Sequence, residues 1–363
     1  MQQNKKQTPI PQSVVDGLIE RLGIQDFAKA TIREVKQVAA MAEKESGVEF
    51  IKMEMGIPGL PAAEVGVKAQ IKALQDGIAH SYPDIQGYPE LKRQASRFVK
   101  AFIGVDIAAE GCVPVCGSMQ GTFASFLTCS QACREKDTVL FIDPGFPVQK
   151  MQLQVQGVKY ETFDVYDFRG DKLRPKIESY LAKGNICAIV YSNPNNPSWV
   201  CLTESELQTI GELATRYDAV VMEDLAYFAM DFREDLSVPF QPPYQPTVAR
   251  YTDNYMLLIS GSKAFSYAGE RIGVVCIGDR LFHRPLPRPQ RTLRGTALRP
   301  RLLHPHALRP EQRHEPLGTV CPGRDVPCGL GRRIPLPRGG EGLWGARPQA
   351  EGHLPASRLP RGL

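Results

Sequence analysis

One lysine in this sequence has small and hydroxylic neighbours. Lys263 lies in the stretch SGSKAFSYAGERIG, residues 260–273, together with Ser260, Ser262 and Arg271. An amine close to another cation in a partly desolvated site has a lowered pKa, so it can attack a carbonyl and later carry protons. A guanidinium offers a planar fork to a phosphate, and serine hydroxyls add donors. The stretch therefore indicates a reactive amine beside an anion-binding site.

A second anion-binding candidate lies earlier in the chain. The segment GSMQGTF, residues 117–123, follows an apolar run and begins a helical pattern. The backbone N–H groups of Ser118, Met119 and Gln120 should then stand free at a helix N-terminus, where phosphate binds well. Taken alone, the segment is a weak signal and fits an ordinary helix cap better.

Polar residues also follow two other apolar runs. SNPNNP, residues 192–197, is an asparagine-rich turn that contains Asn196. EDLAY, residues 223–227, places Asp224 at the end of a run and Tyr227 three residues later. Each of these taken alone fits a turn former or a strand-end cap.

The elements that must position these residues lie between about residues 110 and 280. Helical spacing over 118–133 and 203–217 alternates with short apolar runs, and Thr203 with Glu206 forms a capping-box pattern. This alternation predicts an α/β fold with a mostly parallel sheet, in which ligands collect beyond the carboxyl ends of the strands. The first hundred residues are predicted to be mostly helical, with one helix ending at Gly47. The predicted strands are GCVPVCG, TVLFIDP, ICAIVYSNP, AVVMEDLAY, YMLLISGS and IGVVCIG.

Composition narrows the class of protein. The 363 residues contain no run of eighteen apolar residues, and the polar N-terminus lacks the apolar centre of a signal peptide, so we expect a cytoplasmic protein without a membrane partner. Nine scattered cysteines indicate reduced thiols. Cys112 with Cys116 and Cys129 with Cys133 have a spacing that metal sites also use, but no histidine lies near them. We interpret them as buried thiols and expect no metal.

The composition changes abruptly at about residue 284. Residues 284–363 hold fifteen Arg, five acidic residues and no Lys, Tyr, Asn, Met or Phe, so they carry a charge of +10, against −5 for the rest. The residue types that become more frequent beyond residue 284 have GC-rich codons, whereas the types that are absent there have AT-rich codons. We expect a frame-shifted translation, with genuine disorder as the alternative. An arginine-rich tail attracts polyanions, but it lacks lysines and interleaved aromatics, so we expect no nucleic-acid partner.

Five motifs in this order carry a resemblance to a known family: GSMQ, DPGFP, SNPNNP, EDLAY and SGSKAFSYAGERIG. Over about residues 30–280 the chain resembles the class I/II aminotransferases, fold-type-I enzymes that use pyridoxal 5′-phosphate. The resemblance implies an N-terminal arm and helix belonging to a small domain at 1–55, a cofactor-binding large domain at 56–283 and an anomalous tail at 284–363. The family's C-terminal small domain would be missing.

The resemblance also implies a function. The chain would move an amino group between an amino acid and a 2-oxo acid. A lyase or decarboxylase on the same scaffold, because it shares the cofactor, and an inactive truncated product stay open as alternatives.

The family's residues can be matched one by one. Lys263 resembles the Schiff-base lysine, which also moves a proton between the substrate Cα and the cofactor C4′. Asp224 matches the carboxylate that faces the pyridine nitrogen and keeps it protonated. Asn196 and Tyr227 would hydrogen-bond the 3′ oxygen of the ring. Phe146 matches the aromatic residue that stacks on the ring, although a core phenylalanine is its alternative interpretation.

The remaining matches concern the phosphate and the substrate. Tyr82, in SYPDIQGY, resembles a tyrosine that reaches the phosphate from the partner subunit, which implies a homodimer. Gly56, in MGIPG, matches a glycine beside the substrate carboxylate, although a plain turn glycine fits as well. The residues implied to hold the phosphate are Ser118, Met119 and Gln120 at the helix start, with Ser260, Ser262 and Arg271.

Two departures from the family stand out. The family continues its NP motif into Thr-Gly, whereas this chain has Ser198 and Trp199, so we expect a remodelled loop. In addition, no arginine beyond the lysine motif stands in a context that matches the family's clamp for the substrate carboxylate. We therefore assign no clamp.

Overall fold

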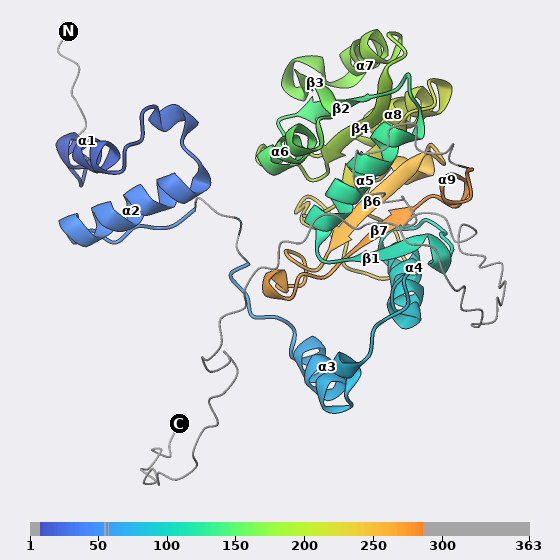
Figure 1. The fold of residues 1–363 in the computed structure, drawn as a ribbon, viewed down its shortest axis with the longest axis horizontal. Coiled ribbons are helices and arrows are strands. Elements are labelled where there is room, and N and C mark those ends of the chain that lie inside the picture. Colours follow the sequence, from blue (N-terminus) through green and yellow to red (C-terminus); the bar gives the residue numbers. More distant parts are fainter. Residues whose placement is uncertain (1–7, 54–55, 57, 286–363) are drawn as a thin grey trace, which may run out of the picture. The chain divides into compact units, whose positions relative to one another are not determined.

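Residues 112–277 form a seven-stranded sheet with helices packed on it (Figure 1). The protein is seen here in a computed structural model that describes residues 8–53, 56 and 58–285. The strand order is β1-β7-β6-β5-β4-β2-β3. The strands are β1 (Cys112–Val115), β2 (Thr138–Asp143), β3 (Lys159–Asp164), β4 (Ile186–Ser192), β5 (Val220–Asp224), β6 (Tyr255–Ser260) and β7 (Gly273–Ile277).

The sheet is mostly parallel, as predicted. β3, β2, β4, β5 and β6 pair in parallel, whereas β7 is antiparallel to both β6 and β1. All six predicted strands are present. β3 was not among them, because its sequence, KYETFD, is polar. Half of its residues are exposed at the sheet edge, so it lacks the apolar run of a buried strand.

The helices begin and end where local signals place them. The side chain of Thr203 accepts a hydrogen bond from the Glu206 amide, and the Glu206 carboxylate accepts one from the Thr203 amide, which confirms the capping box. Gly47 ends its helix with φ of 70°, as glycine readily does. The helices are α1 (Gln12–Arg21), α2 (Ile32–Ser46), α3 (Glu64–Gln75), α4 (Pro89–Ile103), α5 (Ser118–Ala132), α6 (Pro147–Gln156), α7 (Leu173–Leu181), α8 (Glu204–Arg216) and α9 (Asp279–Phe282).

Both faces of the sheet are buried, because successive side chains of a strand point to opposite sides. Leu140 and Ile142 of β2 belong to one apolar cluster, together with residues of α4, α7 and α8. Val139 and Phe141 belong to the other, with residues of α5, α6 and α9. Helices on both faces of a mostly parallel sheet define a doubly wound α/β fold.

The N-terminal helices α1 and α2 have an apolar cluster of their own. Ile10, Leu18, Val38 and Ala42 form its buried part. All described residues belong to the unit Met1–Arg309. The tail predicted from residue 284 lies outside the described residues except for Arg284 and Pro285.

The cysteines differ in burial. Cys112 and Cys129 are buried, Cys133 is partly buried and Cys116 is exposed, so the prediction of buried thiols is wrong for Cys116. Within the described ranges, no three or more His, Cys, Asp or Glu side chains are grouped to hold a metal ion. In the same ranges, no helix is both long and apolar enough to cross a membrane.

Candidate active site

The carboxyl ends of three neighbouring strands meet at one edge of the sheet. Ser192 of β4 and Asp224 of β5 are paired in register, and the amide of Asn193 donates to the Asp224 carbonyl oxygen at 3.2 Å. β6 lies on the other side of β5 and ends at Ser260. Residues that follow these strands are therefore brought to the same edge, as the sequence predicts.

Lys263 follows β6 in a turn and lies partly buried. Its Nζ donates a hydrogen bond to the carbonyl oxygen of Gly56. Burial lowers the pKa of Lys263, and the positive charge of Arg271 lowers it further. A larger fraction of the amine is then neutral at a given pH, which is the form that attacks carbonyl carbon.

Gly56 connects the lysine to Tyr227. A Cβ on Gly56 would lie 2.9 Å from the hydroxyl oxygen of Tyr227, so the peptide of Gly56 passes close to that hydroxyl. Burial raises the pKa of Tyr227, and the nearby Asp224 raises it further, so the phenol stays protonated and can donate. The structure thus brings together three of the predicted residues: Lys263, Gly56 and Tyr227.

Asp224 is a buried carboxylate with few donors. Oδ2 accepts from Gln149 Nε2 at 2.8 Å and Oδ1 from the Ala226 amide at 3.1 Å. Burial raises the pKa of Asp224 to about 6, and these two hydrogen bonds offset only part of that rise. No basic side chain of the described residues contributes to the shift. A cationic N–H group placed against this carboxylate would therefore be strongly stabilised.

Two glycines allow Arg271 to lie against the start of α5. Gly117 precedes this helix with φ of 79° and ψ of 159°, and a Cβ there would lie 2.4 Å from Arg271 Nη2. A Cβ on Gly273 would lie 3.0 Å from the amide nitrogen of Ser118. Arg271 also donates from Nη1 to the Ala268 carbonyl oxygen at 2.9 Å. A guanidinium and a helix N-terminus therefore meet at one point, as an anion requires.

One prediction for this helix start is wrong. The amide of Gln120 is not free, because it donates to the carbonyl oxygen of Gly117 at 3.1 Å. Its side chain turns back as well, since Oε1 accepts from the Cys116 amide at 2.6 Å. Ser118 and Met119 keep their places as the first two residues of the helix. The sequence pattern located the helix end correctly but could not show where the third amide donates.

The other predicted residues differ in what they contact. Ser260 is buried, and its Oγ lies 3.4 Å from the Ser262 amide that donates to it. The amide of Asn196 donates to Ser192 Oγ at 3.0 Å. Phe146 is partly buried and accepts, through its carbonyl oxygen, from the Gln149 amide. Tyr82 is fully exposed at 101%, with no hydrogen bond among the described residues.

Sequence reasoning missed two buried residues next to Asp224. Gln149 gave no signal, because an amide inside a helix has no characteristic pattern. Glu223 is fully buried on β5, and burial raises its pKa to about 7 despite hydrogen bonds from Thr247 Oγ1 at 2.6 Å and the Val248 amide at 3.1 Å. The sequence did offer a signal for Glu223, because a glutamate within an apolar strand is unusual.

The loop with Ser198 and Trp199 makes a tight turn. Asn195 Oδ1 accepts from the Ser198 hydroxyl at 2.7 Å, and Trp199 has φ of 59°, which is uncommon for a residue with a side chain. The Trp199 ring meets the edge of Tyr227 at a centroid distance of 5.4 Å and lies nearly parallel to Phe232 at 6.3 Å. An aromatic group therefore flanks the predicted site at the position where the resemblance leads us to expect a glycine.

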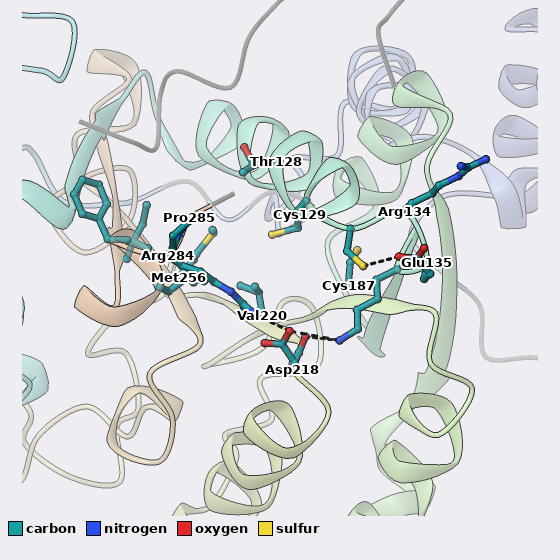
Figure 2. A pocket seen from close by; sticks show the side chains of 16 residues that line it. Thr128, Cys129, Arg134, Glu135, Cys187, Asp218, Val220, Met256, Arg284 and Pro285 are labelled. Atoms are coloured by element: carbon teal, nitrogen blue, oxygen red, sulfur yellow. Dashed lines mark hydrogen bonds and ion pairs between the residues drawn. The ribbon is translucent and has the colours of Figure 1, made fainter. Parts of the chain in front are cut away.

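A cavity of about 380 Å³ lies at the opposite edge of the sheet (Figure 2). Cys187 and Val220, near the amino ends of their strands, line it, and ion pairs from Arg284 and Lys136 to Asp218 close one side. This cavity is separate from Lys263 and Asp224, which stand at the carboxyl edge. We assign no part of the reaction to it.

The chain matches a known family. The chain matches the aminotransferase class I and II family over residues 48–291 and belongs to it. The match continues a few residues past the composition change at about 284.

Named relatives are similar over part of their length. An aspartate aminotransferase of Pyrococcus horikoshii is 25% identical over 249 residues, which are 68% of this chain and 59% of that protein. An LL-diaminopimelate aminotransferase of Halothermothrix orenii is 28% identical over 208 residues, 56% of this chain and 52% of that protein. The chain therefore spans a little over half the length of these relatives.

A solved structure shows the same fold. The aspartate aminotransferase from Thermus thermophilus with maleate superposes with a TM-score of 0.57 at 20% identity, covering 72% of this chain and 65% of that one. At this identity the likeness concerns the fold.

Proposed function

We propose that the chain is a pyridoxal 5′-phosphate-dependent aminotransferase acting on an amino acid and a 2-oxo acid. One observation carries the proposal: the Lys263 amine, with its lowered pKa, reaches the Gly56 peptide beside Tyr227, while Arg271 lies at the start of α5. Family membership supports the same conclusion.

The residues present fit this cofactor. Its phosphate needs a cation and free amides, which Arg271 and the α5 N-terminus supply together with Ser118, Ser260 and Ser262. The closeness of Arg271 to Gly117 means that any side chain at 117 would fill this cradle. At the other end, the deep carboxylate of Asp224 lacks a cationic partner among the described residues, which suits a protonated ring nitrogen.

Each side chain of the candidate site would have its own role in the reaction. When bound, the cofactor supplies an aldehyde that captures amines and a ring that accepts the electron pair left on the substrate Cα. Lys263 would hold the cofactor and then carry the proton at that carbon, for which a lowered pKa suits it. Asp224 would keep the ring nitrogen charged, and Tyr227 with Asn196 would donate to the ring oxygen. Phe146, at the start of α6, would pack on the ring.

The test of the proposal is the attachment of the cofactor. Purified protein mixed with pyridoxal phosphate should gain a visible absorption band, and borohydride should remove the band and label Lys263. Lys263→Ala should abolish both, whereas Lys183→Ala, which removes a surface partner of Glu161, should change neither. An unchanged band in Lys263→Ala would refute the assignment. Formation of a new amino acid from an added 2-oxo acid, without release of free ammonia or carbon dioxide, would distinguish transfer from the lyase and decarboxylase alternatives.

We also propose a homodimer in the cytoplasm. The full exposure of Tyr82 supports the first part, because the resemblance has this tyrosine reach a partner's phosphate. The described cysteines are all free thiols, which supports a reducing compartment. Sedimentation of the purified protein at increasing concentration tests the dimer.

The domain division remains a proposal as well. We place an N-terminal arm and helix at 1–55, the cofactor-binding domain at 56–283 and a frame-shifted tail at 284–363. The separate apolar cluster of α1 and α2 supports the first boundary, and the change of composition supports the second. On this proposal the chain binds cofactor but has little transaminase activity, because no arginine in the tail matches the substrate clamp.

A further inference from the structure

Two cysteines face each other across the edge of the sheet. Cys112 of β1 and Cys276 of β7 are register partners in the antiparallel pair. Both side chains are fully buried and belong to the same apolar cluster, so they point to the same face. Adjacent thiols on paired strands are a place where a covalent bond can form without rearranging the sheet.

The hydrogen-bond pattern shows which kind of pair this is. Ile272 accepts from Gly261 and Gly278 donates to Tyr255, so even-numbered residues of β7 direct their backbone groups toward β6. Cys276 therefore makes no backbone hydrogen bonds to β1.

The sequence and contacts of β1 indicate the same kind of pair. Pro114, two residues from Cys112, has no N–H to give to β7. The carbonyl oxygen of Cys112 instead accepts from Lys92 Nζ at 2.7 Å. Cys112 and Cys276 thus form a non-hydrogen-bonded pair, whose Cα atoms lie about 4.5 Å apart in antiparallel sheets. Disulfides need a separation of about 4.4–6.8 Å.

A buried cation lies beside the pair. Lys92 of α4 is 7% exposed, and its ammonium donates to the carbonyl oxygens of Gln86, Glu110 and Cys112. Hydrogen bonding with Cys276 lowers the pKa of Cys112; burial opposes this, and the Lys92 charge lowers it further. The pKa of Cys276 is raised by the same hydrogen bond and by burial. Cys112 is therefore the thiol that ionises and attacks, and Cys276 the one that follows.

We propose that Cys112 and Cys276 form a reversible disulfide, so that this cross-strand pair is an oxidation site of the protein. With hydrogen peroxide as oxidant, the Cys112 thiolate attacks one peroxide oxygen, the O–O bond breaks, and hydroxide leaves. The resulting sulfenic acid reacts with the Cys276 thiol to form the S–S bond and release water. The two thiols lose two electrons and two protons, and the peroxide becomes two waters.

The site is linked to the candidate active site by the strands themselves. β1 ends two residues before Gly117, and β7 begins two residues after Arg271. The bond would therefore tie together the two strands that carry the anion cradle. β1 has four residues and lies at the sheet edge. Short edge strands open locally most easily, which gives a small oxidant access to buried thiols. The expected Cα separation of about 4.5 Å lies at the short end of the range for disulfides, so the bond would be strained. Strained disulfides are readily reduced by thiols.

Peptide mapping of the full chain tests the proposal. Folded protein is treated with hydrogen peroxide, remaining thiols are alkylated, and trypsin is added. We expect the peptide 272–280, whose only cysteine is Cys276, to appear linked to peptide 101–134, and dithiothreitol to separate them. Cys112→Ser should abolish the link, whereas Cys116→Ser, which removes the exposed thiol of the same peptide, should leave it intact.

Two outcomes would overturn the proposal. One is that peptide 272–280 is recovered fully alkylated after peroxide treatment of wild-type protein. The other is a link that persists in Cys112→Ser. The rate tests the role of the cation: Lys92→Met should slow linking, because removing the positive charge raises the pKa of Cys112 and lowers its thiolate fraction, and Lys92→Arg should restore the rate. If Lys92→Met does not fold, the pH dependence of linking in the wild-type protein is measured instead: a midpoint below that of an ordinary cysteine thiol supports Cys112 as the attacking thiolate, and a midpoint above it contradicts that role.

Discussion

Replacing Gly117 by alanine should lower the stability of the protein and also weaken cofactor binding, for two different reasons. At φ of 79° and ψ of 159° the backbone is in a region almost restricted to glycine, so a side chain costs about 1–3 kcal/mol of unfolding free energy. The new Cβ would also lie 2.4 Å from Arg271 Nη2, so the guanidinium must move. A hydrogen bond to a charged group contributes about 1.5–3 kcal/mol, which corresponds to a loss of roughly 10- to 150-fold in affinity for the phosphate.

Gly157→Ala is the matched control. Gly157 also has positive φ, at 67°, but a Cβ there meets nothing within 4 Å. It should cost about 1 kcal/mol of stability and leave binding unchanged. Stability is measured by urea unfolding and binding by titration with pyridoxal phosphate, with inorganic phosphate as competitor. If Gly117→Ala binds within about twofold of wild type, well below the loss expected from one charged hydrogen bond, the assignment of Arg271 and Gly117 to the phosphate is wrong.

Three further predictions concern charge and reading frame. The pKa of Asp224 is raised to about 6, so its contribution to stability is present below about pH 4 and lost as pH rises through 6. In urea unfolding without cofactor at about pH 8, the unfolding free energy of Asp224→Asn should therefore exceed that of wild type by up to about 3 kcal/mol. With cofactor, any turnover should fall about 10²- to 10³-fold. A variant less stable than wild type at that pH, or one with equal turnover, contradicts this. For Glu206, burial opposes ionisation, but hydrogen bonds from Arg169, Thr203 and Gly170 outweigh it and lower the pKa to about 2. This stabilisation is present above about pH 4.5 and lost as pH falls through 2, so Glu206→Gln should remove about 3 kcal/mol of acid dependence, and an unchanged acid-unfolding profile would refute it. Finally, translating the gene in its other two frames beyond the codon for Arg284 should reveal a helical segment with lysines, tyrosines and an arginine in an apolar strand; if neither frame does, the frame-shift proposal is wrong.

Local sequence determined those parts of this protein that depend on neighbours along the chain. Buried strands such as β4 and β6 are continuous apolar runs, and the capping box of Thr203 with Glu206 spans three residues. Lys263 and Arg271 lie in a single loop between paired strands, so their types and spacing already indicate a reactive amine near an anion site. Strand alternation then places these loops at one edge, because parallel strands share a direction.

Only the tertiary structure decided the contacts between residues far apart in the sequence. Gln149 reaches Asp224 because α6 packs against the sheet, and no pattern marks that amide. The Gln120 amide is occupied by Gly117, which the helix pattern alone did not show. The pairing of Cys112 with Cys276 depends on the register of β1 against β7, and a shift of one residue would turn the two thiols to opposite faces. Register and packing are set by the burial of whole faces, and a short stretch of sequence does not contain that information.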